Sequence, residues 1–308
     1  MQSSTFKYKD QDGVEIFVYK WRPEGTPKVV LQIAHGLAEH AARYERYAQF
    51  MTDAGFVVYA DDHRGHGKTA GTLEKRGILG PGGWKSTVQS LKCLTDLIKR
   101  EYPALPFFFL GHSWGSLLAQ DYIAQWGSGL QGAILTGTNG KQSFIIRKLG
   151  PLMAKNEVKK IGADTPSPTL DRLTFGAFNK PYEPAPTKFE WLSRDHVEVE
   201  KYVNDPFCGF MSTAGMAVEL TWGVNHIAQK VVQHAIPKSL PIYILSGSKD
   251  PSNNCGKGAA ILADTYKKLG IIDIHLKLYP EARHEILNET NRTEVFTDIL
   301  IWIQAHMA

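Results

Sequence analysis

Long apolar runs are missing from this sequence. No stretch approaches the roughly 18 consecutive apolar residues that a membrane-spanning helix needs. The first residues, MQSSTFKYKDQDG, are polar and lack the apolar core and the small-residue cleavage site of a secretory signal. We therefore expect a cytoplasmic protein whose contact with a membrane is at most peripheral.

Charge of one sign is scarce as well. The chain has 35 Lys and Arg against 31 Asp and Glu, which gives a net charge of +4, and its Lys and Arg form no long run. Proteins that bind nucleic acid usually concentrate basic residues in a patch or stripe. The composition therefore gives no reason to expect a nucleic-acid partner.

Cysteine is nearly absent. The three cysteines, Cys93, Cys208 and Cys255, are odd in number and show no metal-binding spacing. We interpret them as reduced thiols of an intracellular protein.

Strand-like apolar runs alternate with helical patterns along most of the 308 residues. Asp12-Gly13 separates two alternating segments, which predicts a β-hairpin. Further strands are predicted at 29–35, 56–62, 107–110, 130–138, 241–250 and 274–280. Helices are predicted at 42–54, 86–101 and 256–269, and in a last segment with Val295, Phe296, Ile299, Leu300, Trp302 and Ile303 on one face. This order predicts an α/β fold with a mostly parallel, doubly covered sheet and an antiparallel N-terminal hairpin.

The alternation stops between residues 140 and 236. This region is rich in proline and aromatic residues and poor in strand-like runs. We therefore expect residues 1–139 and 237–308 to form the sheet-based core, and residues 140–236 to form an inserted cap, or lid.

A five-residue turn, GHSWG at 111–115, stands between an apolar run and a helical pattern. Gly-x-Ser-x-Gly between a strand and a helix is the nucleophile elbow of α/β hydrolases. The turn is so sharp that it requires glycines, and it exposes the serine beside the positive end of the helix. We therefore predict that Ser113 is a nucleophile.

A serine hydroxyl needs a general base, which is held in turn by an acid. In this fold the chain order is Ser, then Asp or Glu, then His. Asp250 follows a predicted strand, and His284 lies between the next strand and the last helix. We predict His284 as the base and Asp250 as the acid. Asp273, which opens a strand near the base, is the weaker candidate.

Backbone N–H groups that form an oxyanion hole are the third requirement. One donor is expected to be Trp114, directly after the nucleophile, and the other Leu37, in the loop that follows strand 29–35. Both donors are main-chain groups, so their large side chains do not disqualify them.

Two other patterns suggest different chemistry, and we reject both. Gly67-Lys68-Thr69 resembles the end of a phosphate loop, but position 62 is Asp rather than Gly and no helix is expected to begin there. A polar group suggests a metal site, but it lacks the His-Glu-x-x-His spacing, and a hydrolase with its own triad needs no metal. That group consists of His35, Glu39, His40, His63 and His66. We expect no metal and no cofactor, and we expect His63 and His66 to satisfy local hydrogen bonds.

Five blocks occur in the order of one known group: AHGLAEHAARY, DDHRGHGKTAG, GHSWGS, GSKDP and RHEILNE. From about residue 6 to 305, the chain resembles the monoacylglycerol lipase and lysophospholipase group of the α/β-hydrolase superfamily, among the serine aminopeptidase-like hydrolases. The phrases FNKPYEPAPTKFEWLSRD and YVNDPFCGF in the expected cap also resemble bacterial lysophospholipases.

The resemblance implies the same triad and oxyanion hole at the positions named above. It also implies that Glu39 and Arg43 lie near the alcohol end of the substrate, with a buried structural ion pair as the alternative. His112, beside the nucleophile, is a further candidate substrate contact. Two positions depart from the group, because Ser116 and Ala38 stand where glycine is common, and either change could alter the floor of the pocket.

These features predict a serine carboxylic-ester hydrolase that works through an acyl-enzyme on small-molecule esters with a lipid-like chain. Monoacylglycerol lipase, lysophospholipase and carboxylesterase activities all fit. Acyl transfer to an alcohol and a proline iminopeptidase-like activity stay open as alternatives. The peptidase would need an acidic site in the cap, for which Glu190, Glu198 and Glu200 are candidates. A non-catalytic binding protein is a third class.

The expected cap is rich in aromatic side chains. Phe175, Phe178, Trp191 and Phe207 are expected either to line an acyl tunnel or to pack inside the cap. An apolar cap also allows transient contact with a lipid surface. The head group, the acyl length and the oligomeric state are not fixed by the sequence.

Overall fold

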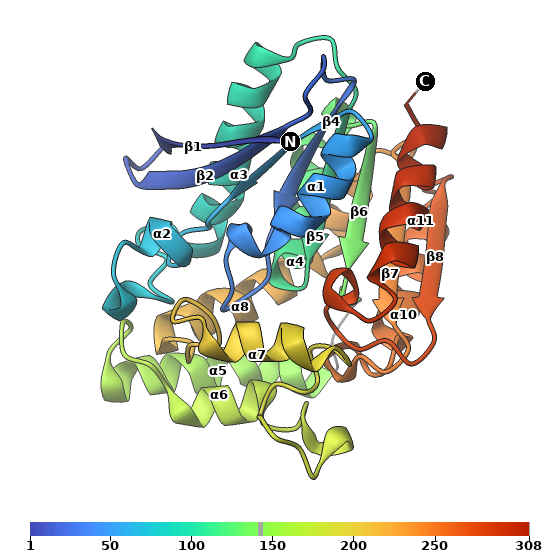
Figure 1. Cartoon of the computed structure of the whole chain (residues 1–308). Helices are drawn as coiled ribbons and strands as arrows, with labels where there is room; N and C mark the ends of the chain where they lie inside the picture. The colour runs from blue at the N-terminus through green and yellow to red at the C-terminus, as the bar shows by residue number, and fades with distance from the viewer. Residues whose placement is uncertain (141–143, 308) are drawn as a thin grey trace.

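The molecule is built around one eight-stranded sheet with the strand order β1-β2-β4-β3-β5-β6-β7-β8 (Figure 1). The computed structural model describes residues 1–140 and 144–307. The strands are β1 (Gln2–Lys9), β2 (Glu15–Arg22), β3 (Val29–Ala34), β4 (Phe56–Asp61), β5 (Phe107–His112), β6 (Gly132–Thr136), β7 (Ile242–Gly247) and β8 (Ile274–Tyr279). They lie within or beside the predicted runs.

Strand direction follows the prediction. β1 and β2 form an antiparallel hairpin, β2 is also antiparallel to β4, and every other neighbouring pair is parallel. All residues of the inner strands β3 to β7 are buried. Successive residues such as Val30 and Leu31 pack into different cores, because a strand points alternate side chains to opposite faces. A sheet buried on both faces therefore needs the continuous apolar runs seen in the sequence.

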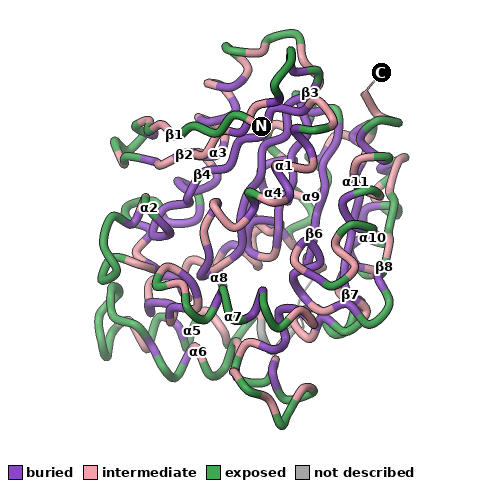
Figure 2. The backbone as a smooth tube through the Cα atoms, in the orientation of Figure 1, coloured by how far each residue is buried: buried purple, intermediate pink, exposed green. Residues whose placement is uncertain are grey.

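Helices cover both faces of the sheet, as predicted. On one face α1 (Glu45–Asp53) and α11 (Arg292–Ala305) complete a core, and on the other face α3 (Gly83–Glu101), α4 (Trp114–Trp126) and α10 (Lys257–Lys268) complete a second one. In α11 the residues Val295, Phe296, Ile299, Trp302 and Ile303 are buried, and Leu300 is half-buried. The strands and the inner sides of these helices form the buried interior in Figure 2. The predicted α/β fold is confirmed.

The chain between β6 and β7, which we call the inserted segment, is helical where it is described. Its helices are α5 (Phe144–Ile161), α6 (Pro168–Phe175), α7 (His196–Asn204), α8 (Ala214–Ile227) and α9 (Lys230–Ala235). Three of them begin at an N-cap whose side chain accepts a backbone N–H: Ser167, Asp195 and Thr213. In Figure 1, α5, α6 and α7 lie across the edge toward which the strands β5, β6 and β7 point. The inserted segment therefore covers the carboxyl ends of the parallel strands.

One local expectation was wrong. A four-residue helix, α2 (Gly67–Ala70), begins at Gly67, where we expected none. The Asp62 carboxylate starts this turn by accepting the N–H of Lys68 at 2.7 Å. A carboxylate therefore lies where a phosphate loop would hold a phosphate. Within residues 1–140 and 144–307, no helix has the length and apolarity that crossing a membrane requires.

Candidate active site

The β5–α4 joint is a sharp turn with Ser113 at its tip. Ser113 has φ 52° and ψ −118°, a backbone conformation that residues other than glycine rarely adopt. A Cβ on Gly115 would lie 2.2 Å from the carbonyl oxygen of Ala34, and one on Gly111 would lie 2.5 Å from the carbonyl oxygen of Gly115. The two glycines therefore let strand, turn and helix approach closely enough to form the elbow.

Three side chains that are far apart in sequence meet at this turn. His284 Nε2 lies 2.8 Å from Ser113 Oγ, and His284 Nδ1 lies 2.8 Å from Asp250 Oδ2. Asp250 follows β7 and His284 follows β8. Because carboxyl ends of parallel strands share one edge of the sheet, both residues reach the turn after β5. The structure thus brings the predicted nucleophile, base and acid into one hydrogen-bonded chain.

The surroundings of these three hydrogen-bonded side chains favour a charged imidazole at His284. Burial opposes the charge, but the Asp250 carboxylate together with Glu285 and Glu39 outweighs it, and the pKa of His284 is raised above its ordinary value. His112 behaves in the opposite way, because burial lowers its pKa to about 3. The two rings lie only 4.9 Å apart between centroids. A neutral histidine therefore lies beside the one that can accept a proton.

Two further residues support His284: Ser252, which was not predicted, and Trp191, which was predicted only as an aromatic residue of the cap. Ser252 Oγ donates to Asp250 Oδ1 at 2.6 Å and lies 3.0 Å from His284 Nδ1. The Trp191 ring lies 4.9 Å from the imidazole, and its carbonyl accepts the His284 N–H at 3.3 Å. Ser252 follows the predicted acid by two positions, so proximity in sequence could have indicated it. Trp191 comes from the inserted segment, and nothing in the sequence links it to position 284.

The predicted oxyanion donors lie on neighbouring strands. Leu37 follows β3 and Trp114 follows β5, and these strands pair with Ala34 opposite Gly111. A Cβ on Gly36 would lie 3.3 Å from the Ser113 Cβ, so the loop after β3 passes close to the nucleophile. Within the described residues, neither the Leu37 N–H nor the Trp114 N–H donates a hydrogen bond to another protein group. Both donors are therefore available to a substrate oxygen.

Glu39 and Arg43 form part of a buried ion network. Arg43 contacts Glu39 at 2.5 Å and binds Glu285 through two hydrogen bonds of 2.6 and 2.7 Å. Glu39 also accepts the Gly36 N–H and the Tyr44 hydroxyl. The ion pair that we gave as the alternative is therefore present. Glu285 was missed because it is 242 positions from Arg43 in sequence.

A cavity of about 890 Å³ opens onto Ser113 between the inserted segment and the sheet. Glu39, His112 and Glu285 line it next to His284, whereas Arg43 lies behind them. Its aromatic lining consists of Phe175, Phe189, Trp191, Tyr202 and Phe210. Two of the four predicted aromatic residues therefore reach the cavity. Phe178 packs between Phe175 and Trp191 instead, and Phe207 lies against His40.

The departures from the glycine pattern lie near Ser113. Ser116 Oγ donates to the Ser113 carbonyl at 2.6 Å, so its hydroxyl braces the elbow. Ala38 lines the cavity with φ 55°, a conformation that glycine adopts at little cost. The acidic residues proposed for a peptidase do not line this cavity. Glu198 pairs with Arg46 and Lys201 instead.

The histidines that suggested a metal site form hydrogen bonds among themselves and with the backbone. His63 Nδ1 lies 3.0 Å from Asp61, and His63 Nε2 lies 3.2 Å from the His35 carbonyl. His66 Nδ1 lies 2.9 Å from the Arg64 carbonyl, and burial lowers the pKa of His66 to about 3. Both nitrogens of His63 and Nδ1 of His66 thus form local hydrogen bonds, as expected, whereas His66 Nε2 is buried with no partner among the described residues.

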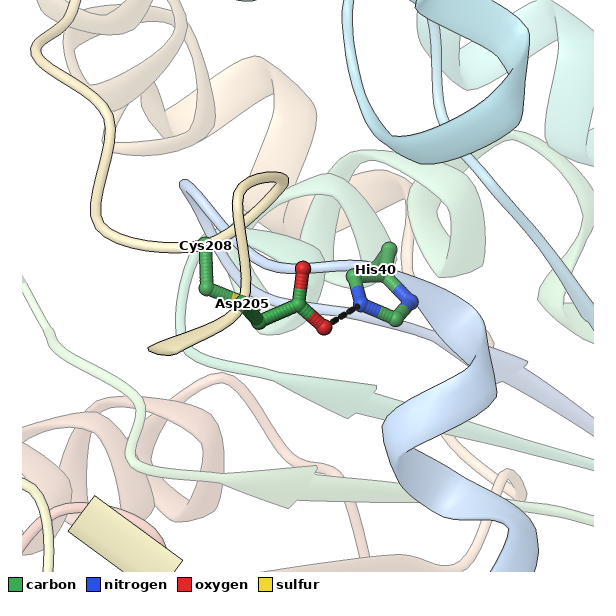
Figure 3. Close-up of side chains that lie close together, drawn as sticks. All are labelled: His40, Asp205 and Cys208. Carbon is green, nitrogen blue, oxygen red and sulfur yellow. Dashed lines mark hydrogen bonds and ion pairs between the residues drawn. The ribbon is translucent and has the colours of Figure 1, made fainter. Parts of the chain in front are cut away.

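A different cluster could bring three metal-binding atoms together in the described part of the chain. Donor atoms of His40, Asp205 and Cys208 lie within 4.8 Å of one another, and Figure 3 shows the Asp205 carboxylate turned toward the His40 ring. Asp205 already accepts His40 Nε2 and the Phe207 N–H, each at 2.8 Å. Burial also raises the pKa of the Cys208 thiol, which disfavours the thiolate that binds a metal. The arrangement fits a hydrogen-bonded tie better than a metal centre.

Fold and site together define an α/β hydrolase with the geometry of a serine hydrolase. Residues 25–291 match the family described as Serine aminopeptidase, S33. The chain belongs to this family.

Similar proteins narrow the class further. The chain is 30% identical to the monoacylglycerol lipase of Mycolicibacterium smegmatis, over 96% of this chain and 95% of that protein. It is 29% identical to the human monoglyceride lipase, over 96% of this chain and 89% of that protein. The structure of a thermostable carboxyl esterase from Bacillus coagulans superimposes over 100% of both chains, with a TM-score of 0.92 and 29% identity. The chain is a monoacylglycerol lipase-like α/β hydrolase, and the enzyme class that its relatives' names indicate is carboxylic ester hydrolase.

Proposed function

We propose that the protein hydrolyses carboxylic esters of a single lipid-like acyl chain, with a monoacylglycerol as the preferred substrate. The observation that carries this proposal is the chain Ser113–His284–Asp250 at the mouth of a large, partly aromatic cavity. The names of the relatives from Mycolicibacterium smegmatis and human support the choice of substrate.

In the proposed mechanism, His284 Nε2 accepts the proton of Ser113 Oγ as that oxygen attacks the ester carbonyl. The Ser113 Oγ–carbon bond forms, and the carbonyl oxygen becomes an oxyanion that accepts the Leu37 and Trp114 N–H groups. Asp250 holds the imidazole tautomer and stabilises its positive charge.

The tetrahedral intermediate collapses when the bond to the alcohol oxygen breaks. His284 gives its proton to that oxygen, the alcohol leaves, and an acyl-enzyme remains on Ser113. Water, deprotonated by His284, then attacks the acyl carbon and releases the fatty acid by the same steps. An acceptor alcohol in place of this water would give acyl transfer, which an assay of free acid against new ester distinguishes.

The two sides of the cavity suit the two parts of such a substrate. We propose that Phe175, Trp191 and Phe210 contact the acyl chain, because each buried methylene contributes about 0.8 kcal/mol. Glu39 and His112, on the polar side, would accept or donate hydrogen bonds to hydroxyls of the alcohol, with Arg43 fixing Glu39 from behind.

We further propose that residues 140–236 act as a cap over the site. The outer side of this region exposes Leu149, Leu152, Met153 and Leu173, which suits transient contact with a lipid surface. Sedimentation with phosphatidylcholine vesicles tests that contact, and a Leu152→Ser variant should sediment less.

The first test is the variant Ser113→Ala. It should fold normally and lose about 10³-fold or more of its ester hydrolysis, because the nucleophile is gone. Wild type should react with a fluorophosphonate probe and the variant should not. An alanine variant that keeps its activity would overturn the assignment of the nucleophile.

A second experiment tests the substrate class. Rates on p-nitrophenyl esters of increasing acyl length should rise toward medium or long chains. Monoacylglycerol should then be hydrolysed faster than a lysophospholipid of the same chain. The reverse order would favour a lysophospholipase, and activity on short acyl chains alone would favour a general carboxylesterase.

A further inference from the structure

The loop that carries the Leu37 N–H is held by the inserted segment. The Ala38 carbonyl oxygen accepts two hydrogen bonds, one from the Gly209 N–H at 2.9 Å and one from the Tyr202 hydroxyl at 2.8 Å. Both donors come from the inserted segment, at the end of α7 and just beyond it. One carbonyl of the oxyanion loop is thus fixed from across the cavity.

A second tie lies two residues further along. His40 Nε2 lies 2.8 Å from Asp205 Oδ2, so a loop residue again bonds the inserted segment (Figure 3). Arg43 adds a contact of a different kind, because its guanidinium lies 4.8 Å from the centre of the Tyr202 ring. The loop 36–40 is therefore joined to the segment 202–209 at separate points.

This loop needs such support because of its backbone. Ala38 has φ 55°, in the left-handed region that a residue with a Cβ adopts only at a cost in energy. Within the loop, the Glu39 carboxylate accepts the Gly36 N–H and so fixes the residue at the start of the loop. This bond does not hold the Ala38 carbonyl, which is held by the inserted segment instead. Relaxation of Ala38 would turn the preceding peptides, including the Leu37 N–H, away from the reacting oxygen.

We propose that the segment Tyr202–Gly209 positions the oxyanion hole, with Tyr202 as the chief positioning residue. Its hydroxyl holds the Ala38 carbonyl, and so keeps the Leu37 N–H aimed at the developing oxyanion. The inference rests on the proposed function, because an oxyanion hole matters only if Ser113 attacks an ester.

The same segment also touches the proposed acyl site. Tyr202, Gly209 and Phe210 all line the cavity of about 890 Å³. An acyl chain that packs against them therefore presses on the residues that hold the Ala38 carbonyl. A substrate whose acyl chain fits well would then have a higher kcat as well as a higher affinity, because part of its binding energy would be used to align the oxyanion hole.

The variant Tyr202→Phe tests the positioning role, since it removes the hydroxyl and keeps the ring. Complete loss of one oxyanion donor costs about 10²–10³-fold in kcat, and a misaligned donor should cost less, roughly 3- to 30-fold. We expect kcat to fall by that factor with KM nearly unchanged. Affinity for phenylboronic acid, whose tetrahedral adduct with serine mimics the intermediate, should fall in parallel.

Tyr47→Phe is the matched control. Tyr47 is buried like Tyr202, but within the described residues its hydroxyl has no hydrogen-bond partner. This variant should keep wild-type kcat and phenylboronic acid affinity. His40→Ala, which breaks the second tie at a partly exposed position, should lower kcat in the same direction as Tyr202→Phe, and it replaces that variant if Tyr202→Phe does not fold.

The outcomes separate the two proposals. If Ser113→Ala is inactive but Tyr202→Phe and His40→Ala keep wild-type kcat, the positioning role is wrong and the proposed function stands. If Tyr202→Phe raises KM alone, the residue is an ordinary substrate contact, and the inference is again overturned. If Ser113→Ala stays active, the proposed function itself fails.

Discussion

His112 and His284 show how far two identical side chains can diverge at short range. Both are buried and their rings lie 4.9 Å apart. Burial lowers the pKa of His112 to about 3, and the nearest partner of its Nδ1 is the neutral Thr136 hydroxyl at 3.0 Å. Burial also acts on His284, but the Asp250 carboxylate reverses the result and raises the pKa. Asp250, with smaller contributions from Glu285 and Glu39, thus determines that His284 rather than His112 can carry a proton.

This contrast predicts the pH dependence of hydrolysis. Only neutral His284 can accept the Ser113 proton, so kcat/KM should rise with pH through a midpoint above the ordinary histidine value of about 6.5. Asp250→Asn should move the midpoint to lower pH and reduce kcat by about 10⁴-fold. Rate profiles on one p-nitrophenyl ester test this. An unchanged midpoint in the variant would show that Asp250 does not set the pKa of His284.

At the scale of single residues, the sequence indicated groups that follow a fixed chain order. Ser113 could be found from its flanking glycines, and Asp250 and His284 from their positions after successive strands. Ser252 lies two positions after Asp250, so proximity in sequence could have indicated it. Glu285 and Tyr202 could not be found in this way, because their roles depend on contacts across the fold, with Arg43 and Ala38, for which no sequence spacing exists.

The β5–α4 joint is the element on which the site depends most. It has no room at Gly115, because the nearest atoms to an added Cβ are the backbone oxygens of Ala34 and His35, at 2.2 and 2.4 Å. Backbone atoms of a central strand cannot move aside as a flexible side chain would. Strand β3 and helix α4 therefore fix the elbow between them.

Gly115→Ala should accordingly destabilise the protein by about 2–3 kcal/mol and reduce ester hydrolysis. Denaturant unfolding at neutral pH measures the change in free energy. Gly25→Ala is the matched control, because nothing lies within 4 Å of its added Cβ. A Gly115→Ala protein as stable as Gly25→Ala would contradict the close approach at the elbow.

Elements differed in how well the sequence predicted them. The inner strands were clear because a strand buried on both faces is apolar throughout, and α3 was clear because Val88, Leu91, Leu94 and Ile98 repeat at helical spacing. Helices of the inserted segment gave weaker patterns. α6 buries only Leu170, and within the described part of the chain α9 buries no residue at all. Neither helix has a continuous apolar stripe; α6 begins at the Ser167 cap, whereas α9 has no side-chain cap.

At the scale of the whole molecule, a small number of buried charges join distant parts of the chain. Arg43 lies between Glu39 and Glu285, with side-chain exposures of 11%, 3% and 6%. Arg43 precedes α1, and Glu285 follows β8, so the network closes the core around the site. Removing one partner from such a group is costly, because another charge is left buried without compensation.

Glu285→Gln should therefore lower the free energy of unfolding by about 3 kcal/mol at pH 7. Burial raises the pKa of Glu285, but Arg43 outweighs it and the net pKa is depressed. The stability that this carboxylate supplies is thus fully present above the ordinary glutamate pKa of about 4.3 and is lost as the pH falls toward the depressed value. Unfolding curves should show the difference between wild type and variant shrinking below about pH 4.3.

Glu15→Gln serves as the control for this measurement. Glu15 pairs with Lys7 on the surface, with both side chains about half exposed, and exposed pairs contribute little. The free energy of unfolding of the Glu15→Gln variant should match that of wild type across the same pH range. A Glu285→Gln deficit that stayed constant down to pH 2 would mean that the carboxylate does not act through its charge.

The distance along the chain between Ser113 and His284, 171 positions, also bears on synthesis. A ribosome completes the elbow and both proposed oxyanion donors long before it adds β8 and the His284 that follows it. Under the proposed mechanism, the growing polypeptide therefore carries a Ser113 hydroxyl without its proton acceptor, and ester hydrolysis should begin only when β8 has joined the sheet. Premature termination anywhere before residue 284 would yield an inert product rather than a partly active one.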